Sequence, residues 1–308
     1  MKYVFISLLL VFFASCSGQQ KPQQTAPEEE EQLTYAFKMP EIPAIITEPL
    51  ERADYLVKHY WDNFDFSDTA YVHLPQVTEQ AFVDYIDVMQ IASYPQVVSA
   101  IKDMLKKAEA DTTMYYYFTN LYEKYLYDPN SPFRNDEFFI PALEFFISSP
   151  ASKEKVRPMY LLELAKRNRV GEKAANFTYT LPNGKQSNLY SLVSDYTLIF
   201  FYNPGCNACE EIMGQLKSSL SIGYLMKENR IKILAVYPDE DLTEWKNYLS
   251  SFPKEWINSY DKGTHIMDKE IYDLKAIPTL FLLDKDKKVI LKDTSFDLLE
   301  NLLRQKIG

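Results

Sequence analysis

The chain has 308 residues, more than most single domains, and this length favours two domains behind a short leader. Its composition, 46% hydrophobic and 25% charged residues, is that of an ordinary globular protein and excludes disorder of the whole chain. A formal net charge of −10, with no concentration of Lys and Arg, excludes a nucleic-acid-binding surface, which needs clustered cations.

The first 16 residues have the form of a secretion signal. Lys2 precedes an apolar run over residues 4–14, about half of the ~20 residues that a membrane-spanning helix needs. The small residues directly before Cys16 resemble the lipobox of bacterial lipoproteins, although Phe13 stands where Leu is usual. The resemblance implies that residues 1–16 are a lipoprotein signal peptide and that Cys16 is lipidated. An ordinary signal peptide that happens to contain a cysteine is the alternative.

Residues 17–34 have the composition of a spacer. They are rich in Gln, Pro, Ser and Glu, with four consecutive glutamates at 28–31, and are too polar to build a core. We therefore expect a disordered polar tether that holds the folded part away from a membrane of the cell envelope. With the lipid on Cys16, this predicts an anchored protein that faces the periplasm.

Residues 35–169 carry apolar side chains mainly at helical spacing, interrupted by breaks that contain proline. The pattern predicts a bundle of about six helices, one near residues 50–61 and others over 78–91, 95–110, 112–127, 136–147 and 152–167. A dense aromatic set, Tyr115–Phe118 with Tyr122, Tyr125 and Tyr127, suits a groove for peptide or glycan. Aromatic residues at helical spacing are more often buried in the core. This part of the sequence contains no motif that indicates a chemical function.

From residue 170 to 308 the pattern changes to alternating strands and helices. Asn183-Gly184 predicts a hairpin turn, and the apolar run 197–202 predicts a central strand covered on both faces. Further strands are expected at 231–237, 279–283 and 289–291, with helices at 189–193, from 206 onward, at 242–249 and at 296–307. We therefore expect a helical bundle followed by an α/β domain.

Cys206-Asn-Ala-Cys209 directly follows the predicted central strand, and Ile277-Pro278 stands about 70 residues later before another strand. These two motifs together resemble the thioredoxin superfamily, and the opening over Gly171–Asn188 resembles its TlpA and ResA-like branch. The resemblance implies a thioredoxin-like fold, thiol-disulfide oxidoreductase activity, and a cis peptide bond before Pro278 beside the cysteines. Residues 35–169 are similar to helical domains of unknown function that precede such modules in some envelope lipoproteins.

The two cysteines suit thiol-disulfide exchange, in which a thiolate attacks a disulfide sulfur. Cys206 stands at a helix start, where unpaired backbone N–H groups and the helix dipole favour a thiolate, so we expect it to attack. Cys209 lies one turn further on and is the expected resolving partner. The expected partners are protein disulfide or dithiol clients and an unidentified membrane thiol donor, and no cofactor is expected.

The motif departs from typical thioredoxin in its Asn-Ala interior, in Gly205 before it, and in Phe200, which replaces a buried acidic residue of the family. Proton transfer to or from Cys209 then needs another group, and Glu210 and Glu211 are the nearest candidates. The alternative is that both are merely solvated carboxylates that oppose thiolate formation.

The cysteine pair could also bind a metal, act as in a peroxiredoxin or form a structural disulfide. A zinc site needs about four ligands, and beyond the pair the chain offers three histidines, of which only His265 lies in the same domain. A copper-handling relative would space its cysteines more widely, and a peroxiredoxin would have Thr or Ser where Asn203 stands. A structural disulfide would close a very small loop. A binding lipoprotein with a non-catalytic thioredoxin-like module is the main alternative to an enzyme.

Overall fold

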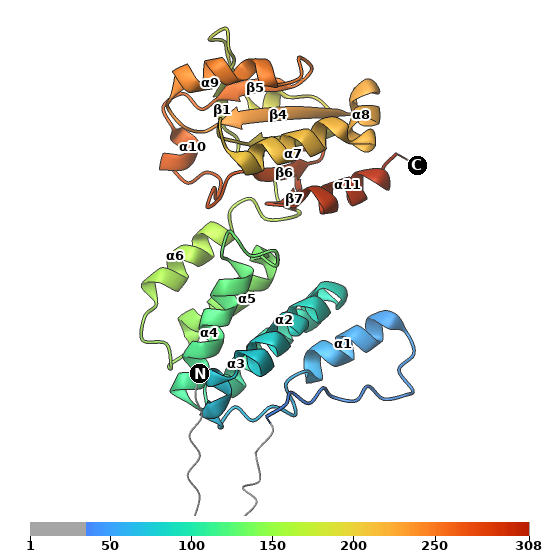
Figure 1. The fold of residues 1–308 in the computed structure, drawn as a ribbon, viewed down its shortest axis with the longest axis vertical. Coiled ribbons are helices and arrows are strands. Elements are labelled where there is room, and N and C mark those ends of the chain that lie inside the picture. Colours follow the sequence, from blue (N-terminus) through green and yellow to red (C-terminus); the bar gives the residue numbers. More distant parts are fainter. Residues whose placement is uncertain (1–34, 308) are drawn as a thin grey trace, which may run out of the picture. The chain divides into compact units, whose positions relative to one another are not determined.

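A computed structural model of the chain describes residues 35–307, and the first half of this part is helical (Figure 1). The bounds agree closely with the helices expected from the apolar spacing. They are α1 (Pro49–His59), the 3-10 helix η1 (Thr69–His73), α2 (Pro75–Ile91), α3 (Tyr94–Ala108), α4 (Thr112–Leu126), α5 (Asp136–Ser148) and α6 (Val156–Ala165).

Local sequence signals explain where these helices begin. Proline occupies the first turn of α1, α2 and α3, where its missing N–H costs nothing. Asp111 accepts hydrogen bonds from the N–H groups of Thr113 and Met114 and so caps α4. Asn135 caps α5 in the same way through the N–H of Phe138. These side chains satisfy backbone donors that a helix start otherwise leaves unpaired.

The core of the helical domain is unusually aromatic. Tyr115, Phe118 and Tyr122 of α4 are at most 1% exposed, and the remaining members of the set, Tyr116, Tyr117, Tyr125 and Tyr127, are partly buried against the same core. Trp61 makes edge-to-face contacts with neighbouring rings, among them Phe118 with ring centroids 5.2 Å apart. The aromatic set is therefore part of the packing, as its helical spacing favours.

The second half contains a mixed β-sheet. Its strands are β1 (Thr178–Thr180), β2 (Gln186–Asn188), β3 (Tyr196–Phe201), β4 (Ile231–Tyr237), β5 (Ile257–Tyr260), β6 (Thr279–Leu283) and β7 (Val289–Lys292). The described strands lie in the order β2-β1-β5-β4-β3-β6-β7. β3 is central, parallel to β4 and antiparallel to β6. A helical domain followed by a thioredoxin-like α/β domain is thus confirmed.

Side chains of β3 alternate between the two faces of the sheet. Leu198 and Phe200 belong to one buried cluster and Ile199 and Phe201 to another, so the strand is covered on both sides. The first cluster includes residues of α7 (Asn207–Ser218), α8 (Leu220–Lys227), α9 (Leu242–Tyr248) and α11 (Phe296–Arg304), and the second includes a residue of α10 (His265–Asp268). The 3-10 helices η2 (Leu189–Ser191) and η3 (Leu249–Ser251) complete the described elements.

Three elements of this half are absent from the sequence interpretation. The helical run after Cys206 breaks at Ser219, whose extended backbone and side-chain cap on the N–H of Ile222 start α8 as a separate helix. Strand β5 is short and polar, and α10 has a single turn. Neither offers an apolar period that a sequence reading can detect.

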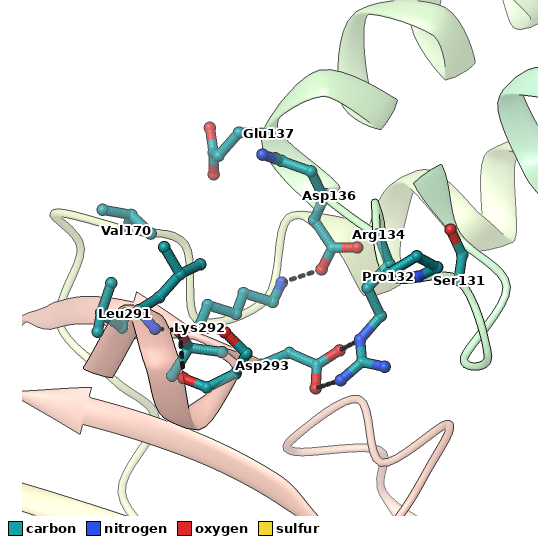
Figure 2. A pocket seen from close by; sticks show the side chains of 13 residues that line it. Ser131, Pro132, Arg134, Asp136, Glu137, Val170, Leu291, Lys292 and Asp293 are labelled. Carbon is teal, nitrogen blue, oxygen red and sulfur yellow. Dashed lines mark hydrogen bonds and ion pairs between the residues drawn. The ribbon is translucent and has the colours of Figure 1, made fainter. Parts of the chain in front are cut away.

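From Ala36 onward the helices and the sheet form one compact unit, and charged side chains join its two halves. Arg134, before α5, pairs with Asp293, after β7, through two N–O contacts of 2.6 and 2.8 Å (Figure 2). Asp136 contacts the Nζ atom of Lys292 at 2.8 Å and that of Lys275 at 3.2 Å. With Asp273, which contacts Lys275 at 3.1 Å, three cations and three carboxylates form a neutral interdomain network.

Candidate functional site

The cysteine pair lies where the central strand of the sheet passes into α7. The parallel pairing of β3 with β4 ends at Phe201 and Val236, and the chain then turns through Pro204 and Gly205 into the helix. Gly205 has φ +70°, a left-handed conformation that favours glycine. The tryptophan that thioredoxins carry at this position would be strained by this backbone.

Cys206 is the N-cap residue of α7 and remains partly exposed. Its Sγ atom accepts a hydrogen bond from the backbone N–H of Cys209 over 3.2 Å, and it lies 3.8 Å from the carbonyl oxygen of Ile277. A backbone donor and the positive end of a helix dipole both stabilise negative charge on sulfur. Cys206 is therefore the accessible sulfur of the pair, with a backbone donor and a helix start beside it.

Cys209 has a contrasting environment on the inner side of α7. Its side chain is 1% exposed and belongs to the same buried cluster as Phe200 and Met213. Burial, and next its contact with Cys206, raises the pKa of the Cys209 thiol to about 12. Because a protonated, inaccessible thiol is a poor first nucleophile, the asymmetry assigns the outer position to Cys206 and the inner one to Cys209.

The loop before β6 closes one side of the site. The Ile277-Pro278 peptide bond is cis, as the family resemblance implies. Strand β6 starts at Thr279, which is paired with Phe201 at the end of β3, so Pro278 lies next to the start of the cysteine segment. Pro278 and both cysteines, predicted from motifs about 70 residues apart, are thus brought together, and their roles stay predictions.

The two candidate carboxylates lie at the surface of α7. Glu210 accepts a hydrogen bond from the hydroxyl of Tyr248 over 3.4 Å, and Glu211 lines a cavity beside Pro278. Both side chains are exposed, whereas Cys209 is enclosed. Their part in proton transfer stays a prediction, because nothing in the structure places either of them against the Cys209 sulfur.

Two tyrosines near the pair are not among the site residues expected from the sequence. Tyr202 is 1% exposed, its hydroxyl accepts a hydrogen bond from Trp245 Nε1 over 3.0 Å, and burial raises its pKa. Burial, then Glu210, then the charges of the two cysteines raise the pKa of Tyr248 to about 12. Tyr202 could have been found as the last residue of the apolar run, but Tyr248 comes from α9 and only the tertiary fold brings it here.

The predictions for the amino terminus lie outside the described residues. The signal peptide (1–16), the tether (17–34) and the lipidation site Cys16 belong to this part of the chain. Over residues 35–307, no helix is both long and apolar enough to cross a membrane. Within the same range, no three His, Cys, Asp or Glu side chains gather as a metal site would require.

Comparison with known proteins agrees with the geometry of both halves. Residues 15–168 match a domain of unknown function, DUF5106, and residues 194–289 match a family described as thioredoxin-like. The first match starts before residue 35, where the sequence pattern places the start of the helical domain.

Individual relatives point the same way. The thiol-disulfide oxidoreductase ResA of Bacillus cereus (strain ZK / E33L) is 32% identical over 123 residues, which cover 40% of this chain and 68% of that relative. ResA of Bacillus anthracis is 31% identical over 121 residues, covering 39% of this chain and 67% of the relative. A crystal structure of a thioredoxin-like protein from Bacteroides caccae is 50% identical with a TM-score of 0.84, and the match covers 88% of this chain and 99% of that one.

These similarities and the placement of the cysteines lead to one assignment. The chain belongs to the ResA-related, thioredoxin-like family of thiol-disulfide oxidoreductases and carries a DUF5106 domain in its amino-terminal half.

Proposed function

We propose that this enzyme exchanges disulfides with protein clients in the cell envelope, with Cys206 as the attacking and Cys209 as the resolving cysteine. The observation that carries the proposal is the difference between the two sulfurs. Cys206 caps a helix and is partly exposed, while Cys209 is buried with its pKa raised to about 12. This is the arrangement that ordered, two-step exchange requires.

In the reducing direction, the Cys206 thiolate attacks one sulfur of a client disulfide. A bond forms between Cys206 Sγ and that sulfur, the client disulfide breaks, and the second client sulfur leaves as a thiolate that takes a proton from water. Cys209 then loses its proton and attacks Cys206 Sγ, which releases the first client sulfur as a thiol. The client gains two electrons and two protons, and the enzyme is left with a Cys206–Cys209 disulfide.

Turnover in this direction needs a dithiol reductant that returns two electrons and two protons to the pair. We assign this role to a membrane thiol donor, in line with an enzyme anchored at a membrane. The same steps run backward when the disulfide of the pair is less stable than the disulfide that the client forms, because the relative reduction potentials set the direction. Client thiols are then oxidised and the pair is reduced, so turnover in that direction needs a disulfide oxidant that takes two electrons and two protons from the pair.

The test is reduction of insulin disulfides by the chain without residues 1–32, which retains all described residues, together with the potential of its dithiol. Cys206→Ser is expected to abolish activity, and Cys209→Ser is expected to accumulate clients as mixed disulfides on Cys206. Activity that is unchanged in Cys206→Ser would overturn the assignment. A Cys209→Ser variant that never traps a protein in cells would instead favour a lipoprotein that only binds envelope partners.

Anchoring through a lipid on Cys16 and a periplasmic location are supported by the sequence of residues 1–34. The direct test is metabolic labelling with an alkyne fatty acid, followed by membrane fractionation of the wild type and Cys16→Ser. We expect label and membrane attachment in the wild type alone. A Cys16→Ser protein that still fractionates with membranes would contradict the lipid anchor.

A further inference from the structure

A cavity of about 440 Å³ beside the cysteine pair has walls from both domains. Its lining includes Ala208 and Glu211 of α7 and, from the loop before β6, Ile277 and Pro278. Pro129 and Asn130, in the loop between α4 and α5 of the helical domain, also line it. The volume falls within the roughly 300–1,000 Å³ that is common for binding sites. The helical domain is therefore part of the surface around the active site.

The wall at Pro129 and Asn130 is fixed in place by the interdomain network. Arg134 donates to the carbonyl oxygen of Pro129 over 2.6 Å while its other nitrogens hold Asp293. Asp136, two residues further on, pairs with Lys275, which stands directly before the Ala276–Pro278 loop. The loop of the helical domain and the loop of the cis proline are thus held to one another by buried ion pairs, and a site formed between them is preorganised.

The cavity carries unbalanced negative charge. Glu211 and Asp297 line it with exposed side chains, and the one arginine of its lining, Arg134, is neutralised by Asp293. Residues that line the cavity also flank the attacking sulfur, since Ala208 is two residues from Cys206 and the Ile277 carbonyl lies 3.8 Å from its Sγ atom. A peptide bonded to Cys206 therefore has this cavity beside it.

We propose that this cavity is the client groove and that its occupant is an extended peptide segment with a lysine or arginine close to the reacting cysteine. The helical domain, through Pro129 and Asn130, supplies one wall and so takes part in client selection. The inference rests on the proposed function, because the client segment reaches the groove when its cysteine reacts with Cys206. Glu211 and Asp297 provide the charges that a basic segment complements.

The test uses the full chain in detergent and three probes. Two are disulfide-linked peptides of equal length, with either Lys or Glu beside the cysteine, and the third is 2-hydroxyethyl disulfide, which is too small to need the groove. Wild type is expected to prefer the Lys peptide. Asn130→Trp, which fills the groove, is expected to raise KM for both peptides about tenfold (~1.4 kcal/mol) and to leave reduction of the small disulfide within about twofold. Gln90→Trp, at an exposed position of α2 that does not line the groove, is the matched control.

Charge is tested separately with Glu211→Gln/Asp297→Asn. The Lys-over-Glu preference is expected to fall about two- to fivefold, as is common when exposed charge pairs are lost. A ratio between two peptides is insensitive to a proton-transfer role of Glu211, because such a role affects both peptides alike. Glu228→Gln, an exposed charge at the end of α8, is the control and keeps the preference.

The outcomes separate the two proposals. Unchanged peptide kinetics in Asn130→Trp, or an unchanged preference in the double variant, overturns the groove while the oxidoreductase assignment stands. Equal loss of activity on peptides and on the small disulfide in Asn130→Trp also overturns it, because the effect is then not specific to client binding. A wild-type protein that reduces none of the three probes overturns the proposed function itself.

Discussion

Cys206 and Cys209 are only three positions apart, but they differ in solvent exposure and in hydrogen bonding. Cys206 receives a backbone N–H at 3.2 Å and is partly exposed, whereas Cys209 is 1% exposed in an apolar cluster. The family's acidic residue near the inner cysteine is replaced by Phe200, which is fully buried. Burial without a neighbouring base leaves Cys209 protonated at neutral pH, and this makes its deprotonation the demanding step of the reaction.

The resolving step is expected to depend steeply on pH. With the Cys209 pKa raised to about 12, the thiolate fraction grows about tenfold per pH unit between pH 6 and 9. The decay of a peptide mixed disulfide on Cys206, followed by stopped-flow, should accelerate accordingly. Glu210→Gln and Glu211→Gln should keep this slope if both carboxylates are merely solvated. A flat profile in the wild type would show that a base accepts the proton, and a change in either variant would identify it.

Gly205 provides a test of backbone strain at the site. Its φ of +70° disfavours any side chain, while a Cβ atom there would meet Glu244 Oε1 at an ordinary 3.7 Å. Gly205→Ala is therefore expected to lower the free energy of unfolding by about 1–2 kcal/mol through strain alone. Gly223→Ala, inside α8 with open space around it, is the control and should raise it by about 0.5–1 kcal/mol. Urea denaturation measures both changes, and a change of the same sign in the two variants would contradict backbone strain at Gly205.

At the scale of elements, the break between α7 and α8 shapes the helical face that covers the active-site strand. Ser219 caps α8, and its hydroxyl donates to the buried Glu300 of α11 over 2.6 Å. Ser221 donates to the same carboxylate over 2.9 Å, and Arg304 approaches it at 3.1 Å. A single buried carboxylate thus ties together the helix start and α11, which is why two short helices can replace the continuous one expected from the apolar spacing.

Replacing Glu300 should lower the free energy of unfolding by an amount that depends on pH. Burial acts to raise the pKa of Glu300, but the two serines and Arg304 outweigh it and hold the pKa below its usual value. Its contribution is therefore present above the unfolded pKa of ~4.3 and is lost as pH falls. Glu300→Gln is expected to cost about 1.5 kcal/mol of unfolding free energy at pH 7 and progressively less below pH 4. A cost that is constant from pH 3 to 7 would argue against this linkage.

At the scale of the molecule, the interdomain network joins a domain of unknown function to the catalytic module. The side chain of Asp136 is 8% exposed and lies between Lys275 and Lys292, and these two cations outweigh the effect of burial and lower its pKa. Burial acts to lower the pKa of Lys275, yet the carboxylates around it raise it above its usual value. Both shifts favour the charged forms, so Asp136 and Lys275 form an ion pair at neutral pH, whereas burial raises the pKa of Asp293 against the opposing effect of Arg134.

Removing the central carboxylate should uncouple the two domains. Asp136→Asn leaves Lys275 and Lys292 without their shared partner and is expected to destabilise the protein by about 3 kcal/mol. Urea denaturation should then show two transitions, since Trp61 reports on the helical domain and Trp245 and Trp256 on the sheet domain. Because the pKa of Asp136 is lowered in the folded protein, the wild type should have the higher free energy of unfolding above about pH 4, and its difference from Asp136→Asn should shrink as the pH falls.

The control for this prediction is the ion pair of Glu123 and Arg157, whose side chains are 40% and 57% exposed. Glu123→Gln is expected to change the unfolding free energy by less than about 1 kcal/mol. A similar loss of unfolding free energy in both variants would show that the interdomain network contributes no more to stability than an exposed ion pair.

The elements with a strong apolar period, the helices of the first half and strands β3, β4 and β6, could be predicted because their periodicity is local. The cysteine pair and Pro278 were identifiable for the same reason, as each stands beside a recognisable strand or helix start. Strand β5 could not be predicted, because a short polar segment carries no apolar period. The placement of Tyr248, Pro129 and Asn130 near the site could not be predicted either, because contacts between distant segments bring them there.

The network of Arg134, Asp136, Lys275, Lys292 and Asp293 joins residues more than 130 positions apart, and no spacing in the sequence relates them. The sequence by itself determined the thiol-disulfide chemistry of the cysteine pair, because its motif is local. Tertiary structure alone decided which sulfur is buried, what surrounds it, and that the helical domain borders the active site, because these depend on contacts between distant segments.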